Sequence, residues 1–452
     1  MTSTFLNREN TVASPGYNRF LVPPAALAVH LSIGQAYAFS TFNLPLTKLI
    51  GITHSVSGDW SQKDVVWIFS IAIAFLGSSA ALFGRWVETV GPRKSMFTAA
   101  VCFSGGFIVS AFGIHLHQLW LLYLGYGVLG GCGLGIGYIS PVSTLIKWFP
   151  DRPGMATGMA IMGFGGGALI AAPLSILLMS HFKTAASNGV LETFVTMGVI
   201  YFMFMMIGVY AVRVPAADWK PAGWVPPSRP SPLVTSADVT VDMAWRTPQF
   251  WLLWMVLCMN VTAGIGVLGV ASPMIQEVFG GRVAPAAAAG FVGLLSLFNM
   301  GGRFVWATAS DYMGRRNTYM VFFLLGILLY STVPTLGHLG SIALFVAAFC
   351  IILSMYGGGF STIPAYLRDI FGTLHVGAIH GRLLTAWSAA GVLGPMLMSY
   401  IRDYQIGHGV PKAQAYSVTM YIMCGLLLVG LLCNFAMRPV ADKYHYHGGD
   451  RS

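Results

Sequence analysis

Charged residues are scarce in this sequence. Only 9% of the 452 residues are Asp, Glu, Lys or Arg, whereas about 25% is usual in a soluble domain. Such a chain has too few charges to cover a water-facing surface of its size, and 56% of its residues are hydrophobic. The mean hydropathy of +0.69 agrees. The composition argues against a soluble enzyme, a disordered protein and a nucleic-acid binder, and it indicates a polytopic membrane protein.

Motifs for several other kinds of chemistry are missing as well. The six cysteines fall within apolar runs and form no CxxC pair, so neither a disulfide nor a metal site is supported. The sequence contains no glycine-rich phosphate-binding loop, which argues against transport driven by ATP. It also lacks the paired acids that a membrane enzyme would use. We therefore expect no metal, no cofactor and no enzymatic activity.

Long apolar runs predict twelve transmembrane helices. Each run can cross about 30 Å of hydrocarbon as a helix of roughly 20 residues, and none alternates as a barrel strand does. The predicted spans are residues 20–45, 64–84, 96–114, 119–146, 154–180, 190–212, 249–274, 286–309, 318–336, 341–366, 377–401 and 415–437. We predict an all-α polytopic fold with two pseudo-symmetric six-helix bundles, residues 20–212 and 249–437. A central loop (213–248) and two tails (1–19 and 438–452) complete the chain.

The placement of basic residues predicts the orientation. Most of the 25 lysines and arginines lie in the two tails, the central loop and the short loops on the same side. Basic loops mark the cytoplasmic side, so we expect both termini in the cytoplasm and a multi-pass protein of the plasma membrane, in bacteria the inner membrane. The net charge of +10 then reflects topology rather than an anionic polymer partner.

The two halves share a repeat at an offset of 223 residues, the distance from Glu88 to Asp311. The matching pairs are Glu88 and Asp311, Gly91 and Gly314, Pro141 and Pro364, Gly154 and Gly377, and Gly158 and Gly381. Two parallel six-helix halves are a known plan of transporters, which bind substrate near the membrane midplane.

Two copies of a short turn stand out within the repeat. The first is residues 84–94 with Gly84, Glu88, Gly91 and Arg93, and the second is residues 310–316 with Asp311, Gly314 and Arg315. A glycine permits a sharp turn, and an acid can pair with basic residues or cap a neighbouring helix. We expect a cytoplasmic latch that favours one access state. A basic loop with a turn glycine is the simpler alternative.

These turns resemble the signature loops of the major facilitator superfamily. Further segments narrow the resemblance to the oxalate/formate antiporter family, relatives of the monocarboxylate transporters. The segments are residues 138–152, 162–167, 219–224, 247–251 and 391–395. The resemblance covers nearly the whole chain and implies a secondary transporter of small carboxylates.

Arg303 is the one basic residue that falls at mid-depth in a predicted span. It precedes Asp311 by eight residues, which at 1.5 Å per residue places it about 12 Å inside the membrane. An arginine there costs ~2.5 kcal/mol or more unless it faces a cavity or a partner. A structural ion pair is not expected, because acids such as Glu192 and Asp64 lie near span ends and not at mid-depth. The depth also makes it difficult for the Arg303 side chain to reach the membrane surface. We expect a guanidinium that faces a carboxylate ligand. Its repeat equivalent is Ala80, so only one half carries the cation.

The resemblance assigns substrate contacts to these positions. It implies that Arg303, in the eighth helix, binds the substrate carboxylate within an aromatic cage. The matching cage positions are Tyr37, Tyr138, Phe164, Tyr356 and Phe360. A cage of this kind excludes water and strengthens the attraction between a guanidinium and a carboxylate.

Two positions depart from the family pattern. Asn299, one helical turn before Arg303, stands where animal monocarboxylate transporters often have an acid, which argues against an aspartate–arginine proton relay. Trp387 stands where the oxalate exchanger has a lysine for a second carboxylate. With one buried cation, a dianion would keep an uncompensated charge that costs several kcal/mol. We therefore predict a monocarboxylate of the lactate, pyruvate or formate class.

His30 is taken as the only histidine within a span. It is either a packing histidine or a proton-coupling group. The leading hypothesis is secondary transport by alternating access, coupled to a proton or to a counter-anion. An oxalate/formate-type exchanger and a receptor on a transporter fold are the alternatives. We expect a monomer in the lipid bilayer, with a small carboxylate anion and no nucleic acid as its partner.

Overall fold

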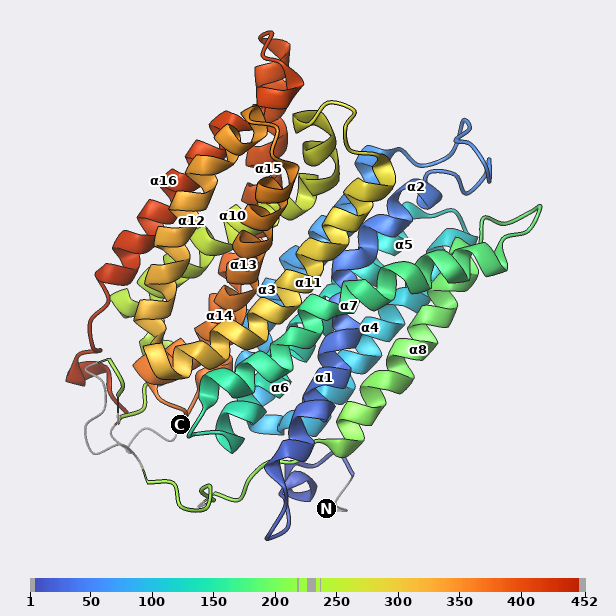
Figure 1. Cartoon of the computed structure of the whole chain (residues 1–452). Coiled ribbons are helices and arrows are strands. Elements are labelled where there is room, and N and C mark those ends of the chain that lie inside the picture. The colour runs from blue at the N-terminus through green and yellow to red at the C-terminus, as the bar shows by residue number, and fades with distance from the viewer. Residues whose placement is uncertain (1–4, 218, 226–232, 236, 447–452) are drawn as a thin grey trace. The chain divides into compact units, whose positions relative to one another are not determined.

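The structure is a computed structural model that describes residues 5–217, 219–225, 233–235 and 237–446 (Figure 1). Within them, twelve helical segments are long and apolar enough to cross a membrane. The helices of the first half are α1 (Val22–Ile33), η3 (Gly34–Phe42), α2 (Asn43–Leu46), α3 (Gln62–Val90), α4 (Pro92–His115), α5 (Leu119–Leu122), η4 (Tyr123–Gly130), α6 (Gly131–Trp148), α7 (Pro153–Phe182) and α8 (Val190–Ala211). Those that follow are α9 (Val241–Ala244), α10 (Pro248–Val278), α11 (Pro285–Met313), α12 (Arg315–His338), α13 (Ile342–Phe371), α14 (Val376–Leu383), α15 (Thr385–Gly407) and α16 (Ser417–Phe435).

Each predicted span coincides with one of the twelve segments, so the predicted number and order of the spans are confirmed. The ends differ, because hydropathy detects the hydrocarbon layer and not the end of the backbone helix. The turn predicted at residues 84–94 is the clearest correction. α3 runs on to Val90, so Gly84 lies inside the helix, and Arg93 belongs to α4. Within this segment only Gly91 lies outside the two helices, and its φ of 83° is in the region that favours glycine. Gly314 does the same between α11 and α12, also with a φ of 83°.

Three spans depart from regular α-helix, which the sequence analysis did not predict. The first span tightens to the 3₁₀ helix η3, and the fourth contains the π-helix η4. The eleventh has one irregular residue, Leu384, between α14 and α15. Such irregular turns often mark functional positions within helices. Tyr37 lies in η3, and Trp387 lies in the first turn of α15.

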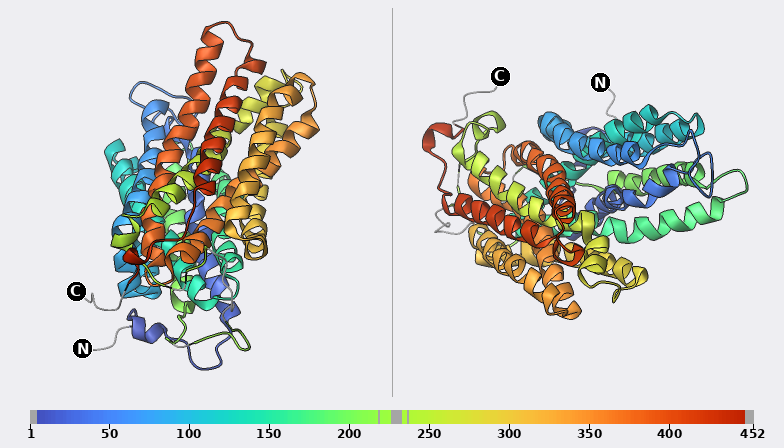
Figure 2. Two further views of the ribbon diagram at one scale, coloured as in Figure 1. Left: turned by 90° about the vertical axis from the view of Figure 1, so that its left-hand side faces the viewer. Right: turned by 90° about the horizontal axis from the view of Figure 1, so that it is seen from above.

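The chain forms two compact units. The first unit comprises Met1–Asp151, Met159–Val225 and Gly377–Ser388, and the second comprises Arg152–Gly158, Pro226–Val376 and Ala389–Ser452. In the first unit α4 lies beside α8 and α3 beside α6 (Figure 1). In the second unit α11 lies beside α13 and α12 beside α16 (Figure 2). The predicted bundle boundaries stay a prediction, and two short segments, 152–158 and 377–388, pack with the unit formed mainly by the other half of the sequence.

Glycines allow α1 and α7 to approach closely in the first unit. A Cβ on Gly167 would lie 2.6 Å from the backbone of Gly34, and a Cβ on Gly34 would lie 2.5 Å from the carbonyl oxygen of Phe164. Backbone atoms cannot move aside as a flexible side chain can. Gly167 and Gly34 therefore serve close helix packing.

We predict that Gly167→Ala lowers the thermal unfolding temperature of the detergent-solubilised protein. The added methyl group overpacks the α1–α7 contact, at a cost of about 1–3 kcal/mol. Gly290→Ala in α11 is the matched control, because no atom lies within 4 Å of its added Cβ, and it should be neutral or slightly stabilising. Equal unfolding temperatures for the two variants would contradict the close contact.

Candidate functional site

Arg303 lies on α11 in the second unit and is fully buried, with 0% of its surface exposed. Its Nε donates a hydrogen bond of 3.2 Å to Oδ1 of Asn299, one turn earlier on the same helix. Its Cζ lies 5.1 Å from the ring centroid of Phe360 on α13, within cation–π range. The Ser361 hydroxyl donates to the Arg303 carbonyl oxygen at 2.6 Å. The guanidinium is therefore held by an amide on one side chain and an aromatic face on another.

Glycines also explain how α13 comes so close to Arg303. Neither Gly302 on α11 nor Gly357 on α13 has room for a Cβ, because the backbones of Ser354 and Asn299 occupy the space. This contact brings the next turn of α13, with Phe360, to the guanidinium. The Phe360 ring meets the Tyr356 ring edge-on, with centroids 5.3 Å apart. Four predicted site residues thus form one group, the arginine cluster: Arg303, Asn299, Tyr356 and Phe360.

The other four predicted substrate contacts form a second group, in the first unit. Trp387 is central, with ring centroids 5.2 Å from Phe164, 5.4 Å from Tyr138 and 6.2 Å from Tyr37. The Phe164 ring packs edge-on against Tyr37 and Tyr138, at 5.0 and 5.5 Å. We call Tyr37, Tyr138, Phe164 and Trp387 the aromatic cluster. Each unit therefore brings four of the predicted residues together.

Histidines lie against the aromatic cluster, and the sequence analysis missed one of them. The His30 ring lies 5.3 Å from Tyr138, and its Nδ1 is 3.2 Å from the carbonyl oxygen of Ala26. His380 on α14 is 5.8 Å from the same tyrosine ring. It is 1% exposed, so the reading of His30 as the only histidine within a span is wrong. His380 also lies inside the predicted span 377–401, close to its start.

The two ring nitrogens of His380 have no hydrogen-bond partner among the described residues. A buried polar atom left in this state costs about 1–3 kcal/mol. The repeat contained the signal that could have found this residue, since the offset of 223 relates His380 to Thr157. A titratable ring therefore replaces a small hydroxyl at equivalent positions.

The acids of the two signature turns cap helices. Oε1 of Glu88 accepts the backbone N–H of Gly377 in the first turn of α14 at 3.0 Å, and Oε2 pairs with Lys147 at 2.8 Å. In the second copy, the Asp311 carboxylate accepts the N–H groups of Gly154 and Met155, both at 2.8 Å, at the start of α7. Gly377 and Gly154 are themselves a repeat pair. Each acid thus caps the equivalent helix in the other half of the sequence.

The other residues of the two signature turns have different structural roles. Arg315 pairs with Asp311 at 2.6 Å and with Asp369 at 3.3 Å. Arg93 is buried, and it donates hydrogen bonds to the carbonyl oxygens of Phe5 at 2.9 Å and Asn10 at 3.1 Å, which anchors the N-terminal segment. A Cβ on Gly84 would lie 2.8 Å from Cα of Ala378, so this glycine serves helix packing.

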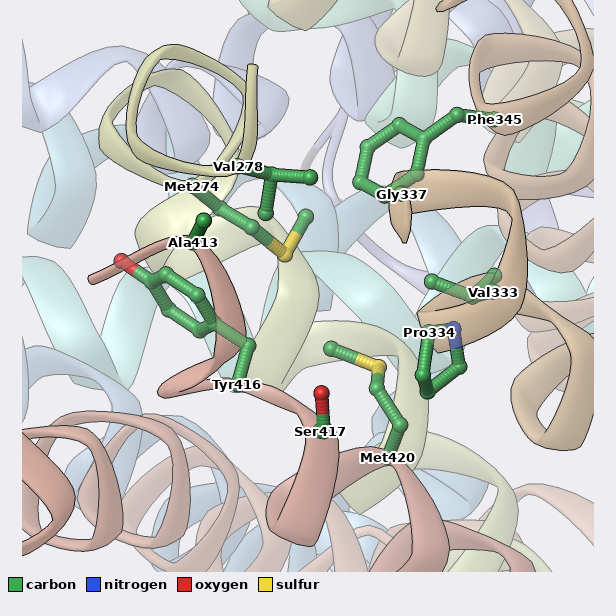
Figure 3. Close-up of a pocket in the computed structure, with 10 residues that line it drawn as sticks. All are labelled: Met274, Val278, Val333, Pro334, Gly337, Phe345, Ala413, Tyr416, Ser417 and Met420. Carbon is green, nitrogen blue, oxygen red and sulfur yellow. The ribbon is translucent and has the colours of Figure 1, made fainter. Parts of the chain in front are cut away.

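A separate small cavity lies in the second unit, among α10, α12, α13 and the start of α16. Figure 3 shows the side chains of Met274 and Met420 extending into its middle. Its volume of about 20 Å³ is room for about one water molecule. None of the predicted site residues lines it. The residues that do are Met274, Val278, Val333, Pro334, Gly337, Phe345, Ala413, Tyr416, Ser417 and Met420.

Comparison with known proteins gives matches along most of the chain. The sequence model of the Major Facilitator Superfamily matches residues 25–395. The oxalate:formate antiporter of Oxalobacter formigenes is 28% identical, over 86% of this chain and 87% of its own length. Apicoplast pyruvate carrier 1 of Toxoplasma gondii is 24% identical, over 85% of this chain and 77% of its own. Among solved structures, the E. coli fucose:proton symporter FucP has the same fold, with a TM-score of 0.62 at 14% identity, covering 92% of this chain and 98% of that one.

We predict that Asp311→Asn speeds hydrogen exchange at the amides of Gly154 and Met155. Loss of a charged cap costs about 1–2 kcal/mol, which corresponds to roughly tenfold faster local exchange. Glu88→Gln is the matched variant and should act on Gly377 instead. Hydrogen–deuterium exchange read by mass spectrometry distinguishes the two helix starts. Unchanged protection of both starts in both variants would contradict the capping roles.

Proposed function

Because the chain belongs to the major facilitator superfamily, it is a transporter and not an enzyme, and we propose that it carries small monocarboxylates by alternating access. The observation that carries this proposal is the fully buried Arg303. Its hydrogen bond to Asn299 and its contact with Phe360 fix the guanidinium plane. A fixed guanidinium offers the planar pair of N–H donors that a carboxylate matches with two parallel hydrogen bonds.

The apolar surroundings strengthen this interaction. Attraction between a guanidinium and a carboxylate grows as the local dielectric constant falls, and Tyr356 and Phe360 keep the arginine cluster apolar. We propose that the aromatic cluster also contacts the substrate during the transport cycle. The names of two relatives, an oxalate:formate antiporter and a pyruvate carrier, support a small carboxylate as cargo.

Trp387 narrows the cargo to one carboxylate. It is fully buried among the rings of the aromatic cluster, at the position where the oxalate exchanger has a lysine. A dianion would need a second cation there, and an indole supplies none. An oxalate/formate-type exchanger is the second candidate, because the oxalate:formate antiporter matches over 86% of this chain.

We further propose where this transporter lies in the cell and which contacts act as its latch. The basic residues favour a multi-pass protein of the plasma membrane with both termini in the cytoplasm. We also propose that the protein works as a monomer. The capping contacts of Glu88 and Asp311 would hold one access state, because each must break if its helix start moves away from the acid. Gly91 and Gly314 shape the turns that present these acids.

Arg303→Gln should raise the KM for lactate or pyruvate at least about 100-fold. This is the effect of losing about 2.8 kcal/mol of charge-assisted hydrogen bonding. The measurement is uptake of labelled lactate, pyruvate, formate and oxalate into proteoliposomes, with and without a pH gradient. Arg282→Gln is the control. This exposed arginine makes one hydrogen bond within the described part of the chain, to the loop carbonyl oxygen of Gly340. Unchanged affinity in Arg303→Gln would remove the basis of the proposed site.

Trp387→Lys tests the argument from a single cation. We expect oxalate uptake to rise at least tenfold relative to lactate uptake, because the lysine compensates the second carboxylate. Trp387→Gln is the matched variant, which also loses the indole but adds no charge, and it should show no such rise. If the wild-type protein takes up oxalate with an affinity equal to that of its best monocarboxylate, the exchanger replaces the monocarboxylate transporter as the better reading.

A further inference from the structure

An apolar groove lies in the first unit, where α1, α7 and α8 meet (Figure 1). Its volume is about 210 Å³, whereas the cavity shown in Figure 3 has about 20 Å³. Four residues of α7 and three of α8 line it, together with Leu31 and Ser32 of α1. None of the predicted site residues is among them, so the proposed carboxylate site does not use this groove.

The lining of the groove suits hydrocarbon and not a polar ligand. Its nine lining residues all belong to the described part of the chain, and none of them is charged. The Ser32 hydroxyl donates to the carbonyl oxygen of Ala28 at 2.9 Å. The Tyr201 ring packs against Phe103 and Phe107 of α4, with centroids 5.7 and 5.6 Å away. An apolar cavity of about 150 Å³ stays dry and takes up a hydrocarbon such as benzene, and this groove is larger.

The groove lies at mid-depth in the membrane. Ser32 is near the middle of the first span, Gly167 near the middle of α7, and Ile200 near the middle of α8. Ile170 and Phe204, on the rim, are exposed. At this depth a multi-pass protein is surrounded by acyl chains, because water and headgroups lie nearer the two membrane surfaces. The open side of the groove therefore faces hydrocarbon.

The shape of the rim favours a lipid tail over a helix of another protein or of a second copy of this chain. Helices that associate in membranes usually meet through small residues, whereas the exposed rim residues here are the bulky Ile170, Ile200 and Phe204. A helix with its side chains is also about 10 Å wide, so it could place only a side chain in a groove of this volume. An acyl chain is thinner and has no side groups.

The groove adjoins the close contact between α1 and α7. A Cβ on Gly167 would lie 2.7 Å from the carbonyl oxygen of Leu31, and both residues line the groove. Phe164 lies one turn earlier on α7, and its ring packs against Tyr37 at 5.0 Å. Atoms next to an empty space lose the dispersion contacts that a neighbour would give them. A chain that fills the groove therefore supports the helix contact beside the aromatic cluster.

We propose that this groove binds the terminal part of a phospholipid acyl chain at a fixed position. Scaled from benzene in a cavity of about 150 Å³, the groove holds roughly eight carbon atoms. The bound chain completes the packing of α1, α7 and α8, and no covalent bond is made or broken. The inference requires only that the protein spans a membrane, so it does not depend on the proposed cargo.

The test is photolabelling of the full chain in proteoliposomes of phosphatidylcholine. One acyl chain carries a diazirine at its terminal carbon, and mass spectrometry maps the labelled residues. We expect residues 170–174 and 200–204 to be labelled about tenfold more than Leu328, an exposed residue near the middle of α12. The same lipid with the diazirine beside the ester group should label neither region, because that group lies near the membrane surface.

Variants that fill the groove make the outcome decisive. Leu174→Trp should lower the labelling of residues 200–204 to the level of Leu328, because the indole occupies the space of the acyl chain. Leu328→Trp is the matched control and should leave labelling of the groove unchanged. Ser32→Leu replaces Leu174→Trp if the latter does not elute as folded protein in size-exclusion chromatography.

Three results would overturn the inference. The first is equal labelling of the groove and Leu328 in the wild-type protein. The second is undiminished labelling in a folded variant with a filled groove. The third is absence of label from the groove, which is the result expected if a second copy of the chain or another protein covers it.

Discussion

A guanidinium inside hydrocarbon needs partners that compensate for lost water, and the buried Arg303 imposes this constraint on the second unit. Its Nε binds Asn299, its face lies against Phe360, and its carbonyl oxygen accepts the Ser361 hydroxyl. These contacts require α11 and α13 to touch, which Gly302 and Gly357 allow by having no side chain. Gly302 and Gly357 therefore permit the helix contact that surrounds one buried charge.

The repeat shows where the two halves differ in chemistry. Its equivalent positions share backbone roles: Gly91 and Gly314 turn the chain, and Glu88 and Asp311 each cap a helix start. Two pairs differ, because Ala80 corresponds to Arg303 and Thr157 to His380. The second half of the sequence thus carries a buried cation and an imidazole at positions where the first half has a small side chain.

Hydropathy and charge placement were enough to predict the twelve spans, because the hydrocarbon layer acts on each segment independently of its neighbours. The helix ends were less accurate, as α3 shows by continuing from residue 84 to Val90. The 3₁₀ stretch at Gly34–Phe42 was not predicted, because hydropathy does not distinguish a 3₁₀ helix from an α-helix. His380 lies inside the predicted span 377–401, but only the tertiary structure shows that its ring lies beside Tyr138.

The sequence by itself determined the membrane class, the number of helices, the repeat and the isolated Arg303, all of which are properties of local composition and spacing. Tertiary structure alone decided that Glu88 caps α14 and that Asp311 caps α7. It also decided which predicted substrate contacts meet within the arginine cluster and which meet within the aromatic cluster. The physical reason is that contacts between helices depend on which faces meet and on how close two backbones can approach. A glycine permits such an approach, but its position in the chain does not say which helix will fill the space.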